Sequence, residues 1–490
     1  MNVFRLLALF VSRLYSSAVN KRNLLTLPIN FCVNFSPVFI WLFIFKNAGV
    51  IPAGIRPNIH NKLAFLSDLY MFGDYWHELV KQYGEGARVA SVFSFFTSSL
   101  FAVVFLICIP LCIWYYIYYK KKVSYNVIDW YDHIFHRRSD GVASHFRPTK
   151  PRVILPFLFP FFTYVMLNVD HLFASQDESN FTKSKDLLAW FSYVLLHLLA
   201  PIFTAVYLYV FQPPGTLKCF AFALGLQNIA GVFSHLLIPM APPWFIHMYG
   251  VKDTEHLNYE TEGYAAGLTR VDSHLGTHLN SKGFHKSPIV FGAVPSLHSA
   301  IAIQCFLFLI TRATTTKANG LTVTPQQQQQ QLRQPTPNDS PTPMDEGCPS
   351  DGNDIGVESF ELEDMLLTTS NDISDSFISS TAPQSVLSKK WLFVFNKALL
   401  PRGLVTAFII LQWWSTMYLD HHFRYDLFVG MCYAITSFLI INTFILQPRV
   451  LKPWCDIRMG KVHDERNEGR TLGMRVFQNT KIEWFFDPLA

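Results

Sequence analysis

The sequence predicts an all-α membrane protein, a bundle of about eight helices that cross a lipid bilayer. Half of its 490 residues are hydrophobic, 16% are aromatic and only 15% are charged, whereas soluble proteins carry about 25% charged residues. The apolar residues also gather in long runs, and a spanning helix needs roughly 20 mainly apolar residues. This composition excludes a chain that is disordered throughout, and it excludes a nucleic-acid-binding protein of the usual basic kind.

Eight apolar runs are long enough to be considered as spans, although the sixth is short and its helix must extend further at one end. Residues 1–26 precede them as an N-terminal segment, whose apolar start we expect to lie on the membrane surface as a helix. Residues 447–490 follow them as a polar tail. The eight runs are 27–45, 97–119, 153–169, 187–211, 219–239, 296–310, 404–419 and 427–446.

The placement of Lys and Arg predicts the orientation of these spans. Basic residues crowd the loop between the second and third runs, and they also follow the last run. Because cytoplasmic loops carry an excess of Lys and Arg, both regions are expected in the cytosol. Eight spans then place both termini in the cytosol. The loops at 46–96, 170–186, 240–295 and 420–426 are left on the lumenal side.

One segment, 311–389, does not fit the membrane pattern. It contains a glutamine run at 326–331, several prolines and many acidic residues. Such a composition cannot bury enough apolar surface to fold, so we expect a disordered cytosolic insert. The insert is either a passive spacer or a phosphorylatable regulatory loop. The insert separates two parts of the predicted catalytic membrane core, residues 153–310 and residues 390–446. The N-terminal spans and their basic loop, residues 27–152, precede the first part.

Two short motifs beside predicted spans carry residues suited to chemistry, PSLHS at 295–299 and DHHFRYD at 420–426. His422 and Asp426 are four residues apart, so on a helix they would share one face. A carboxylate beside an imidazole orients it and stabilises its cation, and such a histidine can attack phosphorus. A second histidine, His298, could then serve as acid and base. The alternative is that each histidine only forms hydrogen bonds within the bundle.

Together, PSLHS and the pattern S-T-x5-H-x3-D from Ser415 to Asp426 resemble the second and third motifs of the type 2 phosphatidic acid phosphatase (PAP2) superfamily. Those proteins are helical membrane phosphotransferases and phosphatases. The resemblance implies a PAP2-like core in which His298 is the acid–base residue, His422 the nucleophile and Asp426 its orienting partner.

The chain departs from the family pattern where the family binds phosphate. Ser415 and Thr416 stand in place of Ser-Arg, and no K-x6-R-P motif is present. A phosphodiester carries less charge than a monoester and needs fewer cations, so the departure favours transfer from a phospholipid diester. We expect Arg270, Arg424 and Ser296 to bind substrate, with the two arginines as replacement cations.

Longer stretches narrow the resemblance to the fungal inositol-phosphorylceramide synthase group, among them GLQNIAGVFSHLLIPMAPPWF and MYLDHHFRYDLFVG. Others, such as NLLTLPINF and the terminal EWFFDPLA, resemble the branch of this group that acts on mannosylated acceptors. This branch transfers inositol phosphate from phosphatidylinositol to mannosyl-inositol-phosphorylceramide and releases diacylglycerol in a Golgi membrane, without a cofactor. The alternatives are a synthase that acts on ceramide and a transporter without catalysis.

A metal site is not expected. The eight cysteines are scattered without CxxC pairs, so neither a zinc site nor a disulfide framework is indicated. His274, His278 and His285 could suggest a membrane di-iron centre, but such centres need many imidazoles from several clusters. The alternatives for these histidines are a headgroup contact and a structural role.

Overall fold

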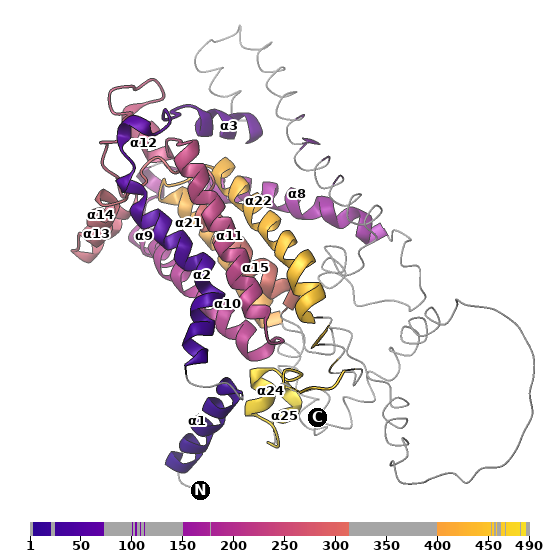
Figure 1. The fold of residues 1–490 in the computed structure, drawn as a ribbon. Helices are drawn as coiled ribbons and strands as arrows, with labels where there is room; N and C mark the ends of the chain where they lie inside the picture. Colours follow the sequence, from indigo (N-terminus) through magenta and orange to yellow (C-terminus); the bar gives the residue numbers. More distant parts are fainter. Residues whose placement is uncertain are drawn as a thin grey trace, which may run out of the picture.

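The computed structural model describes residues 3–20, 25–72, 150–176, 178–312, 399–451 and most of 453–486, with isolated positions between 100 and 112. Within these ranges every regular element is a helix, and no strand is present beyond isolated bridges. The longer helices lie side by side in one bundle (Figure 1). The prediction of an all-α fold is therefore confirmed.

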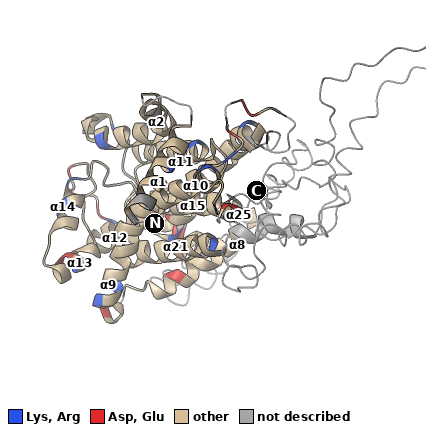
Figure 2. Cartoon of the chain, turned by 90° about the horizontal axis from the view of Figure 1, so that it is seen from below, with Lys and Arg blue, Asp and Glu red and all other residues tan. Residues whose placement is uncertain are grey.

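Four helices of the described residues are long and apolar enough to cross a membrane: Pro28–Val50, Lys183–Phe211, Thr216–Leu237 and Arg424–Leu451. Each coincides with a predicted run. Three more predicted runs coincide with α8 (Lys150–Phe173), α15 (Leu297–Arg312) and α21 (Leu399–Tyr418). The run at 97–119 lies almost entirely outside the described residues, so the count of eight spans stays a prediction. Seen after a 90° turn in Figure 2, the helices carry few charged side chains.

Helix α15 forms the centre of the bundle. It packs against α10 (His197–Phe211), α11 (Thr216–Leu237), α21 and α22 (Arg424–Ile441). All its residues from Ser299 to Leu309 are buried, and a helix that is buried all round belongs to the core of a large protein or a membrane bundle. Helix α2 (Thr26–Asn47) covers α11, and a Cβ atom on Gly225 would lie 2.3 Å from the Cβ of Pro37.

Short helices gather at one end of the bundle, which we call the α12 end. They are α3 (Leu63–Phe72), α9 (Lys183–Trp190), α12 (Pro243–Tyr249), α13 (Leu268–Leu275) and α14 (Leu279–His285). Main-chain hydrogen bonds tie their loops together, since His60 pairs with Met240 and Met240 with Gly292. These loops fix the segment that enters α15.

The first helix of the chain and the short helices near its C-terminus lie together at the opposite end of the bundle (Figure 1). Helix α1 (Val3–Val19) packs against α24 (Leu472–Val476), and Arg13 Nη1 donates a 3.1 Å hydrogen bond to the carbonyl of Gln478. An even number of spans predicts this arrangement. The insert expected at 311–389 lies outside the described residues, except that residues 311 and 312 continue α15.

Candidate active site

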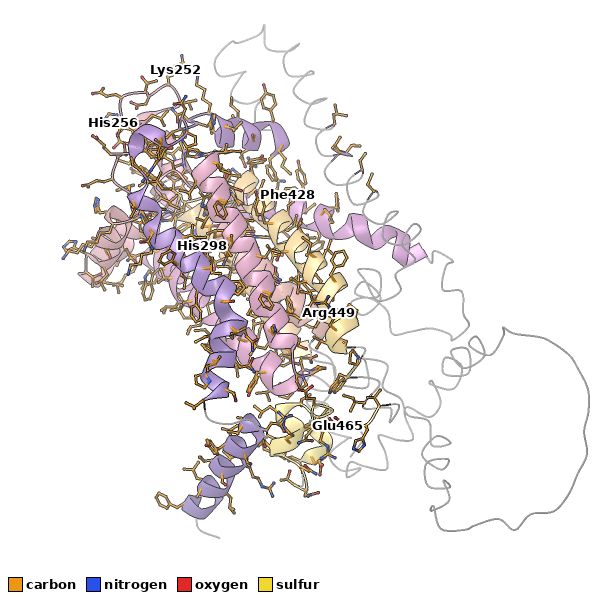
Figure 3. All side chains as sticks on the ribbon, in the orientation of Figure 1. Lys252, His256, His298, Phe428, Arg449 and Glu465 are labelled. Carbon is orange, nitrogen blue, oxygen red and sulfur yellow. The ribbon has the colours of Figure 1, made fainter. Side chains whose placement is uncertain are left out.

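The two histidine motifs are joined directly at the α12 end of the bundle. The main-chain nitrogen of Ser296 donates a 3.0 Å hydrogen bond to the carbonyl of Asp426. Ser299 Oγ donates to the carbonyl of Leu427 at 2.7 Å, and Trp413 Nε1 donates to Ser299 Oγ at 2.9 Å. These bonds connect α15, α21 and α22. Figure 3 labels His298 within the bundle, below the loop that carries Lys252 and His256.

The proposed catalytic imidazoles are neighbours. The ring centroids of His298 and His422 are 5.7 Å apart, so both can reach one phosphate group. Nδ1 of His422 lies 3.4 Å from Oδ2 of Asp426, and Asp426 is fully buried. The structure thus brings the three predicted catalytic residues together.

The local geometry of this contact differs from the sequence-based expectation that His422 and Asp426 share a helix face. Helix α22 begins at Arg424, so His422 precedes it. Asp426 lies in the first helical turn, and its Oδ2 accepts a 2.9 Å hydrogen bond from the main-chain nitrogen of Phe423. A carboxylate at this position commonly reaches back to the helix start, and here it also meets the imidazole.

The environment of His422 favours the neutral imidazole. Only 10% of its side chain is exposed. Burial lowers the pKa of His422 to about 4, against a smaller opposing effect of a hydrogen bond with the backbone of Ala293. Near pH 7 the ring is therefore uncharged and keeps a lone pair, as a nucleophile requires.

Three aromatic residues that the sequence analysis did not select complete the site. The ring of Tyr193 stacks on His298 at 4.2 Å and on His421 at 4.8 Å. His197 lies 4.2 Å from His298, and Phe284 stacks on His421 at 4.8 Å. For two of these residues the sequence does contain a signal that they contribute to a site. Tyr193 and His197 are polar aromatic residues four positions apart within an apolar run. Residues 191–196 form a π-helix, which often marks functional sites.

Arg270 belongs to a cluster around the buried carboxylate of Asp186. Its Nε donates to Oδ1 of Asp186 at 2.9 Å, and its guanidinium lies 3.8 Å from the ring centre of Phe181. His274 and Tyr418 bond the same carboxylate at 3.0 and 3.1 Å. Nη2 of Arg270 is buried without a hydrogen-bond partner, while 27% of the side chain is exposed. Arg270 therefore has an unpartnered nitrogen, Nη2, that is able to donate to a ligand.

The other two residues expected to bind substrate have partners inside the protein. Arg424 is 4% exposed and its Nη2 lies 2.7 Å from Oδ2 of Asp68, while Nη1 donates to Oδ1 of Asn168 at 3.3 Å. Ser296 is fully buried, and its Oγ accepts from the nitrogen of Ser299 at 3.4 Å, as a residue that caps a helix start does. This geometry favours positioning roles for both residues.

Two of the three histidines considered for a metal centre bond different carboxylates of the protein. His274 bonds Asp186, and Nδ1 of His285 lies 2.9 Å from Glu262. Among the described residues, no group of three or more His, Cys, Asp or Glu side chains is arranged to hold a metal ion. The di-iron alternative therefore has no ligand set in this part of the chain.

Comparison with known proteins places these features in a family. Residues 166–324 match the PAP2 superfamily, a range that contains His298 and ends before His422. Inositolphosphotransferase 1 of Saccharomyces cerevisiae is 53% identical over the full length of both chains. The catalytic subunit of inositol phosphorylceramide synthase of Schizosaccharomyces pombe is 42% identical over 25% of this chain and 29% of its own.

A bacterial relative matches a similar fraction of the chain. Phosphoinositol dihydroceramide synthase of Bacteroides thetaiotaomicron is 33% identical over 22% of this chain and 35% of its own. No solved structure matches the chain.

Proposed function

The chain belongs to the PAP2 superfamily and is an inositolphosphotransferase of sphingolipid synthesis, and we propose that its acceptor is mannosyl-inositol-phosphorylceramide. The donor is phosphatidylinositol, and the second product is diacylglycerol. The similarity to the yeast inositolphosphotransferase over both full chains supports this acceptor, because the inositol phosphorylceramide synthase of S. pombe shares only a quarter of the chain. A synthase that acts on ceramide is the second candidate.

The observation that carries the mechanism is the approach of His298, His422 and Asp426. Nδ1 of His422 faces Asp426, so we assign the attack on phosphorus to Nε2. The bond from phosphorus to the diacylglycerol oxygen breaks, and this oxygen takes a proton from protonated His298. An inositol-phosphoryl group is then bound to His422.

The second half-reaction reverses these roles. A hydroxyl of the acceptor attacks the phosphorus, and the now neutral His298 accepts its proton. The bond to His422 breaks, and the enzyme returns to its starting state. Because diacylglycerol leaves before the acceptor enters, both bulky lipids use one site in turn and the kinetics are ping-pong.

Positive charge for the phosphate comes from Arg270 in this proposal. Its Nη2 is the unpartnered donor, and its element is tied to the histidine loop by a 3.0 Å hydrogen bond from the nitrogen of Gly267 to the carbonyl of Leu419. Such preorganised donors stabilise the charge that develops in the transition state. No metal is used, so activity should withstand chelators.

The membrane setting is part of the proposal. The positive charge beside the predicted spans supports a cytosolic position for both termini, and the contact between α1 and α24 is consistent with one shared side for the two terminal regions. The catalytic histidines at the α12 end would then face the lumen of a Golgi-type compartment.

The test is to trap the intermediate. Purified protein is mixed with phosphatidylinositol labelled in its inositol ring, and the reaction is stopped with alkali, in which phosphohistidine survives. We expect the protein to become labelled and the label to be released by acid. His422→Ala should abolish the labelling, and addition of mannosyl-inositol-phosphorylceramide should remove the label from the wild-type protein. Discharge by ceramide alone would support the second candidate. An active wild-type protein that never acquires label would contradict the covalent mechanism.

A further inference from the structure

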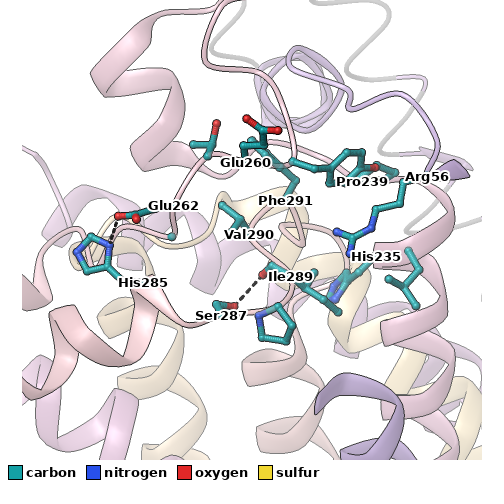
Figure 4. Close-up of a pocket in the computed structure, with 15 residues that line it drawn as sticks. Arg56, His235, Pro239, Glu260, Glu262, His285, Ser287, Ile289, Val290 and Phe291 are labelled. Atoms are coloured by element: carbon teal, nitrogen blue, oxygen red, sulfur yellow. Dashed lines mark hydrogen bonds and ion pairs between the residues drawn. The ribbon is translucent and has the colours of Figure 1, made fainter. Parts of the chain in front are cut away.

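A cavity of about 190 Å³ lies at the α12 end (Figure 4), and neither His298 nor the rings stacked on it are among the residues that line it. It is bounded by residues from four separate parts of the chain: the loop after α2, the end of α11 with the residues that follow it, the loop between α12 and α13, and the segment from the end of α14 to Phe291. Its walls include charged and aromatic side chains, namely Arg56, His235, Tyr259, Glu260, Glu262 and His285.

One short segment connects the cavity to the catalytic histidines. Residues 289–291 line the cavity, and the backbone of Ala293, two positions later, is close enough to His422 to influence the pKa of its imidazole. Because a chain advances at most about 3.6 Å per residue, the wall at Phe291 lies within about 7 Å of Ala293. His235, another wall residue, bonds the carbonyl of Pro295 at 2.9 Å, directly before the first motif. A molecule in the cavity therefore lies beside the site of transfer.

The cavity wall is held in place by its own contacts. Arg56 donates from Nε to the carbonyl of Ile51 at 2.9 Å and from Nη2 to that of Ala48 at 3.0 Å. Its guanidinium lies 4.9 Å from the ring centre of Tyr259, and the hydroxyl of Tyr259 donates to the carbonyl of Pro57 at 2.6 Å. The cation and the ring are thus fixed before any ligand binds, which lowers the entropy cost of binding.

The chemistry of the walls selects one class of ligand. Two carboxylates, Glu260 and Glu262, oppose the entry of a phosphate group. Apolar side chains such as Leu236, Ile289 and Phe291 also line the cavity, but the charged groups beside them oppose the burial of a whole acyl chain. Hydroxyl groups both donate and accept hydrogen bonds, so neighbouring hydroxyls of a sugar ring can donate to the carboxylates and accept from Arg56. The ring of Tyr259 offers an apolar face. This combination suits an uncharged cyclic polyol.

We propose that this cavity is the subsite for the sugar headgroup of the acceptor, which it holds so that one hydroxyl meets the phosphoryl group on His422. The inference rests on the proposed function and adds to it the residues that choose the acceptor. A ceramide without a headgroup would leave the cavity empty. The cavity residues therefore determine the preference for glycosylated acceptors over ceramide.

Ping-pong kinetics allow a sharp test, because kcat/KM for each lipid reports on its own half-reaction. We compare the wild type with the double variant Glu260→Gln/Glu262→Gln, which keeps side-chain shape and removes both charges. Both side chains are exposed, so the variant should fold. We expect kcat/KM for the mannosylated acceptor to fall at least about tenfold, as loss of hydrogen bonds to charged groups predicts. The value for phosphatidylinositol should be unchanged.

Glu255→Gln is the matched control, since Glu255 is exposed on the same loop and does not line the cavity. It should behave as the wild type. An unchanged acceptor kcat/KM in the double variant would overturn the subsite. A loss confined to phosphatidylinositol would also overturn it, because the cavity would then hold the donor inositol. The wild-type reaction tests the proposed acceptor separately from the proposed subsite. A wild-type protein that uses only ceramide would refute the acceptor, whereas an unchanged kcat/KM in the double variant would refute only the subsite.

Discussion

Ser296 and Asp426, far apart in the sequence, are joined by a 3.0 Å main-chain hydrogen bond that sets the distance between the two halves of the catalytic site. His298 follows Ser296 by two positions, and His422 is in contact with the Asp426 side chain. The approach of the two segments requires α22 to lie against the start of α15 without a side chain between them. Gly430 provides this space, because a Cβ atom there would lie 2.3 Å from the carbonyl oxygen of Ser296.

The first prediction concerns that contact. Gly430→Ala should push α22 away from Ser296 and widen the gap between His298 and His422. Overpacking of this kind costs about 1–3 kcal/mol of stability, and a displacement of about 1 Å can cost roughly 10²-fold in rate. The rate of product formation per folded protein, after correction for abundance in the membrane, measures the effect.

Gly403→Ala is the control, since a Cβ atom on Gly403 has no heavy atom within 4 Å. It should leave both activity and stability close to those of the wild type. If Gly430→Ala were as active as Gly403→Ala, the spacing of the two segments would not govern catalysis.

The second prediction separates the two adjacent histidines. His422→Ala should lower the rate at least about 10²-fold at normal abundance, because it removes the nucleophile. His421 is 6% exposed and stacks between Tyr193 and Phe284. His421→Phe keeps a flat ring in this position and should retain most of the activity. Product is measured at saturating phosphatidylinositol. The opposite order of the two variants would assign the nucleophile to His421.

The third prediction is the response to pH. His422 acts as a neutral imidazole, and burial lowers its pKa from 6.5 to about 4. Since protonation removes the lone pair, activity should not fall as the pH drops from 7 to 5, a change that also favours the protonated form of the acid His298. It should be lost, on the acid side, only as the pH falls through about 4. The measurement is kcat/KM for phosphatidylinositol against pH in protein that stays folded. Loss of activity centred near pH 6.5 would show that His422 is solvated in the working enzyme.

The sequence predicted the helical class, because apolar runs are a local property. Its two histidine motifs also singled out His298, His422 and Asp426, which the structure brings together. The same information could not show that Arg424 is paired with Asp68, a contact between α22 and α3 that only tertiary packing creates. Similarly, Asp186 falls in a segment, 170–186, that the sequence predicts only as a lumenal loop, yet in the structure it lies in α9 and bonds Arg270, His274 and Tyr418. The last span was expected to begin at residue 427, after a loop at 420–426, whereas α22 already begins at Arg424, because an apolar run does not reveal where its helix begins.

The fourth prediction decides between two roles for Arg424, substrate binding and positioning. The guanidinium of Arg424 and the carboxylate of Asp68 are both buried, and the other oxygen of Asp68 accepts from the main-chain nitrogen of Tyr425 at 2.8 Å. Removal of one partner leaves the other charge unpaired and costs about 3–5 kcal/mol. Asp68→Asn and Arg424→Met should therefore each lower the Tm in detergent and lower the activity.

The double variant Asp68→Asn/Arg424→Met removes both charges while Asn keeps an oxygen for the nitrogen of Tyr425. Replacement of a buried ion pair by neutral groups of similar size is often neutral or stabilising, so the Tm should return close to the wild-type value. If Arg424 only positions the start of α22, activity should return together with stability, and the interaction energy of the double-mutant cycle should appear in both measurements. A double variant that is stable but inactive would instead show that the guanidinium itself contacts the phosphate, as the sequence led us to expect.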